Sequence, residues 1–171
     1  MYAKLIRNIL MFCGLLVLQL LVIDNIGFGA YIHPCIYVLF ILLLPFDISR
    51  QRLMINGFII GMIVDIFNGT PGLNAAATVL MAYLRPSVIS LTTRKSDIEG
   101  KEYPSVSEMG LQWFIIYSLI LLLAHNLLLF ILEAFSIKLI GIVLLEVICS
   151  VPVSLLAILL IIYIFDLKKI N

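Results

Sequence analysis

Two glycines and an aspartate share one face of a predicted helix. Gly57, Gly61 and Asp65 are spaced four residues apart, and residues with that spacing lie on the same side of an α-helix. Small residues at this spacing let a second helix approach closely. The pattern fits either an internal helix pair or a face that receives the helix of a partner protein.

Asp65 is followed directly by a turn, the run Asn68-Gly69-Thr70-Pro71-Gly72, whose residues favour turns. Asp65 lies about 12 residues, or roughly 18 Å, into its predicted helix, which is still inside a hydrocarbon core of about 30 Å. A carboxylate at that depth must face protein or water. We expect it to cap backbone N–H groups of the turn or of the next helix. Transport of protons or ions is the alternative role.

A second polar set consists of His125, Asn126 and Glu146. If the chain turns near residue 135, His125 comes about ten residues before the turn and Glu146 about eleven after it. Antiparallel helices then place the two side chains at similar depth. Two alternatives follow: a His125–Glu146 hydrogen bond or ion pair that neutralises the carboxylate, or separate partners for each side chain.

Arg85 stands directly before Pro86 in the next predicted helix. Its distance from the turn differs from that of Asp65 by about nine residues, or roughly 13 Å, so the two charges cannot easily meet. We therefore expect the Arg85 side chain to extend along its helix to the cytoplasmic surface.

The elements that must position these residues are membrane helices. Of the 171 residues, 63% are hydrophobic and 12% are charged, against roughly 45–50% and about 25% in soluble domains. This composition excludes an ordinary soluble domain. The net charge of +1 gives no electrostatic basis for binding nucleic acid.

A helix that spans the membrane needs about 20 mainly apolar residues. The sequence predicts an all-α integral membrane protein, a single polytopic domain over residues 1–171 with six transmembrane helices. These are expected at about 5–23, 31–46, 53–67, 73–92, 110–132 and 139–165.

The basic residues set the expected orientation. With six crossings, nine of the 11 lysines and arginines fall on one side of the membrane, and the positive-inside rule makes that side, with both termini, cytoplasmic. The nine are Lys4, Arg7, Arg50, Arg52, Arg94, Lys95, Lys101, Lys168 and Lys169.

Motifs of common catalytic and cofactor-binding sites are absent from the sequence. It has no Walker A loop, dinucleotide glycine fingerprint, G-x-S-x-G or H-E-x-x-H. We expect no catalytic residue, no cofactor and no metal site, and hence a protein that is not an enzyme.

The region after residue 56 resembles a known family. The glycines, the acid, the turn and the alanine and tyrosine that follow are similar to the core motif of the rod shape-determining MreD family. The residues that carry the resemblance are Gly57, Phe58, Gly61, Asp65, Gly69, Gly72, Ala75, Ala82, Tyr83 and Leu84, with Pro34, Tyr37, Leu44 and Pro45 upstream.

The resemblance implies a function that composition cannot show. MreD-like proteins sit in the bacterial cytoplasmic (inner) membrane and belong to the cell-elongation machinery, where they support lateral peptidoglycan synthesis and rod shape. They bind the bitopic protein MreC and, through it, actin-like MreB, the glycosyltransferase RodA and a class B penicillin-binding protein. Their helices are arranged similarly to the substrate-binding subunits of energy-coupling-factor transporters.

The expectation is therefore a non-enzymatic membrane scaffold surrounded by lipid. Gly57, Gly61, Asp65, Gly69, Gly72, Ala75 and Tyr83 are its candidate packing or partner-binding residues, and His125 and Glu146 its candidate intramembrane pair. The alternative is a small-molecule-binding membrane subunit of a transporter.

Overall fold

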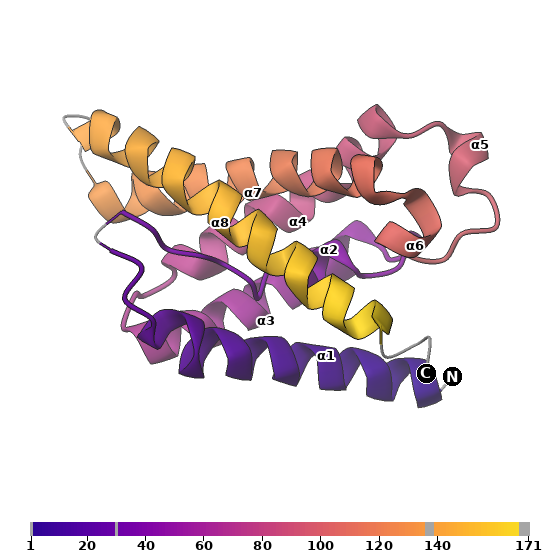
Figure 1. Ribbon diagram of the computed structural model, residues 1–171, viewed down its shortest axis with the longest axis horizontal. Coiled ribbons are helices and arrows are strands. Elements are labelled where there is room, and N and C mark those ends of the chain that lie inside the picture. Colours follow the sequence, from indigo (N-terminus) through magenta and orange to yellow (C-terminus); the bar gives the residue numbers. More distant parts are fainter. Residues whose placement is uncertain (1, 30, 136–138, 168–171) are drawn as a thin grey trace.

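Five long helices account for most of the chain in the computed structural model, which describes residues 2–29, 31–135 and 139–167. The long helices lie along the long axis of the molecule, and short helices occupy the connections (Figure 1). No strand occurs within these ranges. The elements are α1 (Tyr2–Leu21), η1 (Ile23–Asn25), α2 (Leu39–Leu42), α3 (Arg50–Asn68), α4 (Leu73–Thr92), α5 (Lys95–Ile98), α6 (Val106–Met109), α7 (Leu111–Ala134) and α8 (Ile140–Leu167).

Within the described ranges, four helical segments are long and apolar enough to cross a membrane: Ile6–Asn25, Leu73–Thr92, Leu111–Ala134 and Ile140–Ile164. They confirm the predicted helices at 5–23, 73–92, 110–132 and 139–165 to within a few residues. The helix predicted at 53–67 also forms, as α3, and begins at Arg50. Its arginines, asparagines and aspartate leave it less apolar than the other four.

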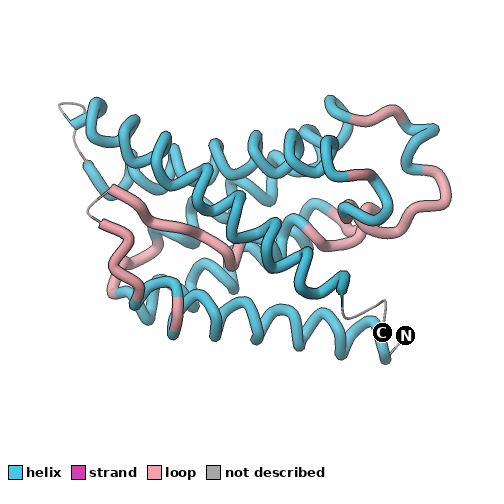
Figure 2. The backbone as a smooth tube through the Cα atoms, viewed as in Figure 1, coloured by secondary structure: helices cyan, strands magenta, loops and turns pink. Residues whose placement is uncertain are grey.

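The helix predicted over 31–46 is wrong. Only Leu39–Leu42 is helical there, and the remainder follows an irregular path through the interior (Figure 2). Pro34 disfavours helical backbone at the residue before it, and Leu44-Pro45 ends the single helical turn. Hydropathy reports that a segment is buried, but it does not distinguish helix from irregular backbone.

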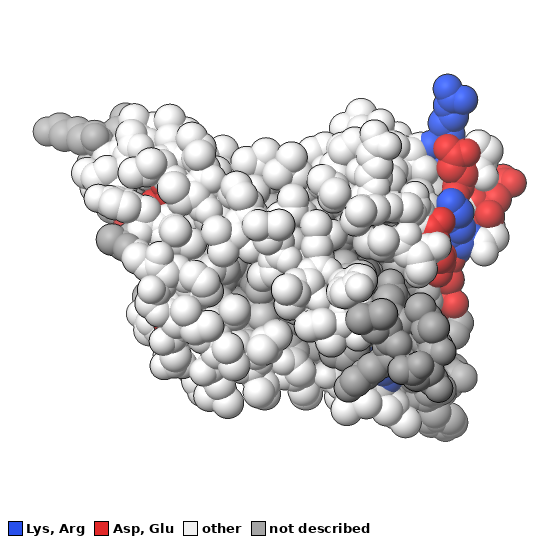
Figure 3. Space-filling view, in the orientation of Figure 1, with Lys and Arg blue, Asp and Glu red and all other residues white. Residues whose placement is uncertain are grey.

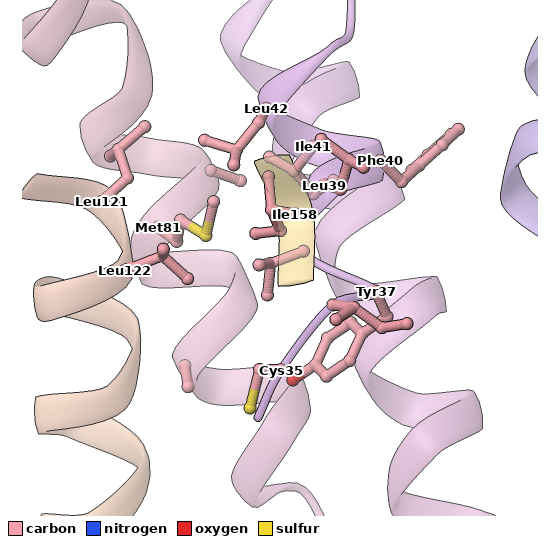
Figure 4. Close-up of a cluster of buried hydrophobic side chains, with 14 of the residues drawn as sticks. Cys35, Tyr37, Leu39, Phe40, Ile41, Leu42, Met81, Leu121, Leu122 and Ile158 are labelled. Atoms are coloured by element: carbon pink, nitrogen blue, oxygen red, sulfur yellow. The ribbon is translucent and has the colours of Figure 1, made fainter. Parts of the chain in front are cut away.

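We call residues 31–46 the buried segment, because it forms the centre of the core. Every residue from Pro34 to Leu42 is buried. Its side chains meet Met81 of α4, Leu121 and Leu122 of α7, and Ile158 of α8 (Figure 4). The helices therefore pack around this segment as well as against one another.

Side chains take over the role that helix hydrogen bonds would have played in the buried segment. Gln19 of α1 donates from Nε2 to the Pro34 carbonyl (3.0 Å) and accepts at Oε1 from the Ile36 N–H (2.8 Å). Ser150 and Ser154 of α8 accept from the N–H groups of His33 (2.9 Å) and Cys35 (3.0 Å). An unpaired backbone group in hydrocarbon costs several kcal/mol, so these bonds make the irregular path possible.

Charged residues gather at one end of the molecule, which we call the charged end. In Figure 3 most of the visible charges lie there, beside α5 and α6, and only a few acidic atoms show at the opposite end. The Arg7 guanidinium lies 4.4 Å from the centre of the Tyr103 ring, so the start of α1 is joined to the connection before α7. Burial raises the pKa of the Tyr103 phenol above its ordinary value, and the ring faces Arg7 in its neutral form.

Gln19→Leu is expected to destabilise the protein strongly. The change leaves one buried N–H and one buried carbonyl without their partner, at about 1–3 kcal/mol for each. Thermal unfolding in detergent should show a clear fall in Tm. Gln112→Leu is the matched control, because Gln112 is exposed in the first turn of α7. Equal Tm values for the two variants would contradict the role of Gln19.

Candidate functional site

Asp65 caps the helix that follows the turn, as its position in the sequence predicts. The side chain is only 2% exposed. Its Oδ1 accepts hydrogen bonds from the Asn74 N–H (2.9 Å) and the Thr70 hydroxyl (2.8 Å), and Oδ2 accepts from the Ala75 N–H (2.9 Å). The first N–H groups of a helix have no partner within it and carry partial positive charge. The carboxylate of α3 thus satisfies the start of α4.

The turn between α3 and α4 requires glycine at both ends. Gly69 ends α3 with φ of 68° and Gly72 precedes α4 with φ of 84°, values that side chains disfavour. Gly72 occupies the N-cap position, where Ser, Thr, Asp or Asn would ordinarily supply the capping oxygen. Because glycine has no side chain, the cap comes from Asp65 instead.

Gly57 and Gly61 face α4 at very short range. A Cβ placed on Gly61 would lie 2.5 Å from the Ala75 Cα and 2.7 Å from the Asn74 carbonyl oxygen. A Cβ on Gly57 would lie 3.0 Å from the Thr78 carbonyl oxygen. The close approach predicted from the glycine spacing occurs within this chain, and α4 covers the glycine face.

A chain of polar side chains continues from Asp65 to α7. Asn74 Nδ2 donates to Asp65 Oδ1 (3.0 Å), and the Tyr37 hydroxyl donates to Asn74 Oδ1 (3.0 Å). The same hydroxyl lies 3.0 Å from His125 Nε2, and the Thr78 hydroxyl lies 3.3 Å from that nitrogen. Four elements, α3, α4, α7 and the buried segment, are thereby joined through one buried network.

His125 does not pair with Glu146. Its Nε2 faces Tyr37 and Thr78, and its Nδ1 has no hydrogen-bond partner among the described residues. No hydrogen bond or ion pair joins Glu146 to His125 within the described residues. Similar depth along two helices was therefore insufficient, because pairing also requires the side chains to point at each other around the helix axes.

Arg85 does not reach the surface. It is 1% exposed, and its guanidinium donates to the Tyr117 hydroxyl (2.9 Å) and to the carbonyls of Leu44 and Pro45. Tyr117 in turn donates to the Leu42 carbonyl (3.0 Å). The expectation of an extended, surface-seeking side chain is wrong, because the end of the buried segment offers carbonyl groups that only a donor-rich side chain can satisfy.

The structure thus brings most of the predicted residues together. Tyr83 is the exception on α4: it is 45% exposed and packs under the Arg50 guanidinium at 4.8 Å.

Sequence reasoning missed the roles of Gln19, Thr78 and Tyr117. For Gln19 a signal was present, since an amide among the apolar residues of the second half of α1 needs a polar partner.

The site holds acidic, imidazole and phenol groups, which form hydrogen bonds with one another and with backbone groups. Among the described residues no group of three His, Cys, Asp or Glu side chains is placed to hold a metal ion.

No family model matches the chain, and no curated protein or solved structure matches it either. The resemblance to the MreD family therefore rests on the motif residues alone.

Gly61→Ala is expected to destabilise the α3–α4 pair by about 1–3 kcal/mol or more, because the added methyl meets backbone atoms that cannot move aside. Gly57→Ala should cost less. Gly14→Ala on α1 is the control, since nothing lies within 4 Å of its Cβ position and alanine favours helix. Unfolding in detergent should rank the losses Gly61, Gly57, Gly14, and a different order would contradict this packing.

Asp65→Asn is expected to lower the free energy of unfolding by about 2 kcal/mol or more, since hydrogen bonds to a charged acceptor contribute about 1.5–3 kcal/mol each. An amide also directs its NH₂ group at donors that need an acceptor. Asp47→Asn serves as the matched control, because Asp47 is exposed. A Tm for Asp65→Asn as high as that of the control would show that the carboxylate charge is not needed for the cap.

Proposed function

We propose that the protein is a non-enzymatic membrane scaffold of the bacterial cell-elongation machinery. In this role it binds an MreC-like bitopic protein in the inner membrane. Through that partner it would act with actin-like MreB, a RodA-type glycosyltransferase and a class B penicillin-binding protein in lateral peptidoglycan synthesis. Support comes from the MreD-like motif and from the use of that motif's residues in building the α3–α4 pair.

The proposed binding surface for the partner is the outward side of α3. This helix has 19 residues, about 28 Å at 1.5 Å per residue, yet it is not among the four apolar enough to span a membrane by themselves. Its last turn exposes two large side chains, Ile66 (71% exposed) and Phe67 (70% exposed). A partner's helix packed against the last turns of α3 would cover these apolar side chains.

The spacing of the glycines alone allowed this face to receive a partner's helix, but in this proposal it packs inside the protein. Gly57, Gly61 and Asp65 face α4, so the partner meets the opposite side of α3. The motif residues then act indirectly, because they fix the position of α3 relative to α4 and so orient its outer surface.

The six-crossing topology belongs to the same proposal. The buried segment would count as the second crossing, since it runs from the end of α1 back to the start of α3 (Figure 1). Such irregular backbone is compatible with a membrane only where protein covers it. Both termini would then be cytoplasmic, with the charged end on that side, in an arrangement like that of the energy-coupling-factor subunits.

A second candidate is a small-molecule-binding subunit of a transporter. It is favoured by His125 Nδ1 and Asn126 Oδ1, which are buried without a hydrogen-bond partner among the described residues. Such atoms are uncommon in folded proteins, and a bound solute would supply the missing bonds.

The double variant Ile66→Ala, Phe67→Ala is expected to reduce co-purification of the MreC-like partner at least about tenfold, because interface anchors of this size commonly contribute 1–2 kcal/mol or more. Ile148→Ala, Leu156→Ala on α8 is the control, since both side chains are 67% exposed. Folded yield is measured for all variants. Unchanged co-purification with normal yield would count against this surface.

Depletion in the native cell separates the two functions. The scaffold predicts rounded cells with disordered wall insertion, restored by the wild type and the α8 control but not by the α3 double variant. A growth defect relieved by a particular nutrient would favour the transporter subunit.

A further inference from the structure

A groove opens between α1, α3 and the end of the buried segment, at the half of the molecule that carries the charged end. Its volume is about 450 Å³. The Phe12 and Phe40 rings, 5.2 Å apart in an edge-to-face arrangement, line it together with Ile59. Asn8 and Arg52 line it one to two turns closer to the charged end than Phe12 and Ile59. The groove is therefore polar at the end nearer the charged end of the molecule and more apolar away from it.

Two opposite charges at the groove are unpaired. Asp47 and Arg52 both line it, and neither side chain forms a hydrogen bond or ion pair with a described residue. Other arginines are already engaged: Arg7 with Tyr103 and Arg50 with Tyr83. A ligand that carries one negative and one positive group would complement this pair.

The volume restricts the occupant. A single turn of α-helix with its side chains is a cylinder about 10–12 Å wide and 5.4 Å long, or roughly 400–600 Å³. The groove holds about one such turn, so it is too small to enclose the transmembrane helix of a partner. A flexible hydrocarbon chain can lie along its apolar residues, with a head group at the polar end.

We propose that this groove binds a phospholipid whose head group carries both a phosphate and a primary ammonium, such as a phosphatidylethanolamine. The phosphate contacts the Arg52 guanidinium, which matches phosphate oxygens in geometry and charge. The ammonium contacts the Asp47 carboxylate, and one acyl chain lies along Phe12 and Phe40. The site is independent of the proposed partner surface, which uses the far half of α3.

Native mass spectrometry of the delipidated full-length protein in detergent tests the site. Dioleoyl phosphatidylethanolamine, dioleoyl phosphatidylglycerol and a polyprenyl phosphate are titrated separately and in equimolar competition. The ethanolamine lipid is expected to bind about two- to fivefold more tightly than the glycerol lipid, as for one partly exposed charge pair. Equal affinities, or tighter binding of either anionic lipid, would overturn the proposal.

Variants separate the two charge contacts. Asp47→Asn should abolish the preference for the ethanolamine lipid and leave phosphatidylglycerol binding intact or improved. Arg52→Gln should weaken both lipids. If Asp47→Asn still binds the ethanolamine lipid more tightly than the glycerol lipid, the Asp47 carboxylate does not bind the ammonium group and the proposal fails.

Filling the groove tests its location. Ile59→Trp should displace the lipid, whereas Ile55→Trp on the same helix should not, because Ile55 is exposed outside the groove. Equal lipid loss in the two variants, or none in either, would place the lipid elsewhere. A matching Tm for both tryptophan variants shows that the comparison is made on folded protein.

Discussion

An irregular stretch of backbone at the centre of a hydrocarbon-embedded protein must have all its polar groups satisfied by other parts of the chain. Helices meet this requirement internally, but only Leu39–Leu42 of residues 31–46 is helical. On either side of that turn, backbone N–H and C=O groups bond to the side chains of Gln19, Ser150, Ser154, Tyr117 and Arg85. These side chains come from α1, α4, α7 and α8, so one requirement ties four helices to the same core.

The same rule accounts for both deeply buried charges. Asp65 is an acceptor placed where helix α4 begins and donors lack partners, and Arg85 is a donor placed where the buried segment ends and carbonyls lack partners. Each charge is compensated by backbone dipoles, and no ion pair links them to an opposite charge within the described residues. A buried charge is tolerated when it is fully hydrogen-bonded. At both sites the partners are backbone N–H or C=O groups that would otherwise lack a hydrogen bond.

This internal use of polar groups shapes what the protein offers to others. Most of the polar side chains at membrane depth are committed to the core, and the helices present mainly apolar side chains outward. Interaction then depends on the shape of helix faces. Two such features differ from a plain lipid-facing surface: the outward side of α3, and the groove beside it with its unpaired Asp47 and Arg52. We propose the first as the partner surface and the second as a lipid site, because only the second combines opposite unpaired charges with an apolar groove.

The sequence by itself determined the features that depend on near neighbours. Apolar runs located α1, α4, α7 and α8, because hydropathy over about 20 residues is a local property. The glycine spacing and the turn likewise predicted the close helix pair and the Asp65 cap, whose partners lie nine and ten residues away. Only the tertiary structure decided the course of the buried segment and the partners of His125 and Arg85. Those contacts span 88 residues from Tyr37 to His125, 41 from Leu44 to Arg85 and 117 from His33 to Ser150. Which polar groups meet over such distances depends on how the helices rotate and pack, and no local pattern contains that information.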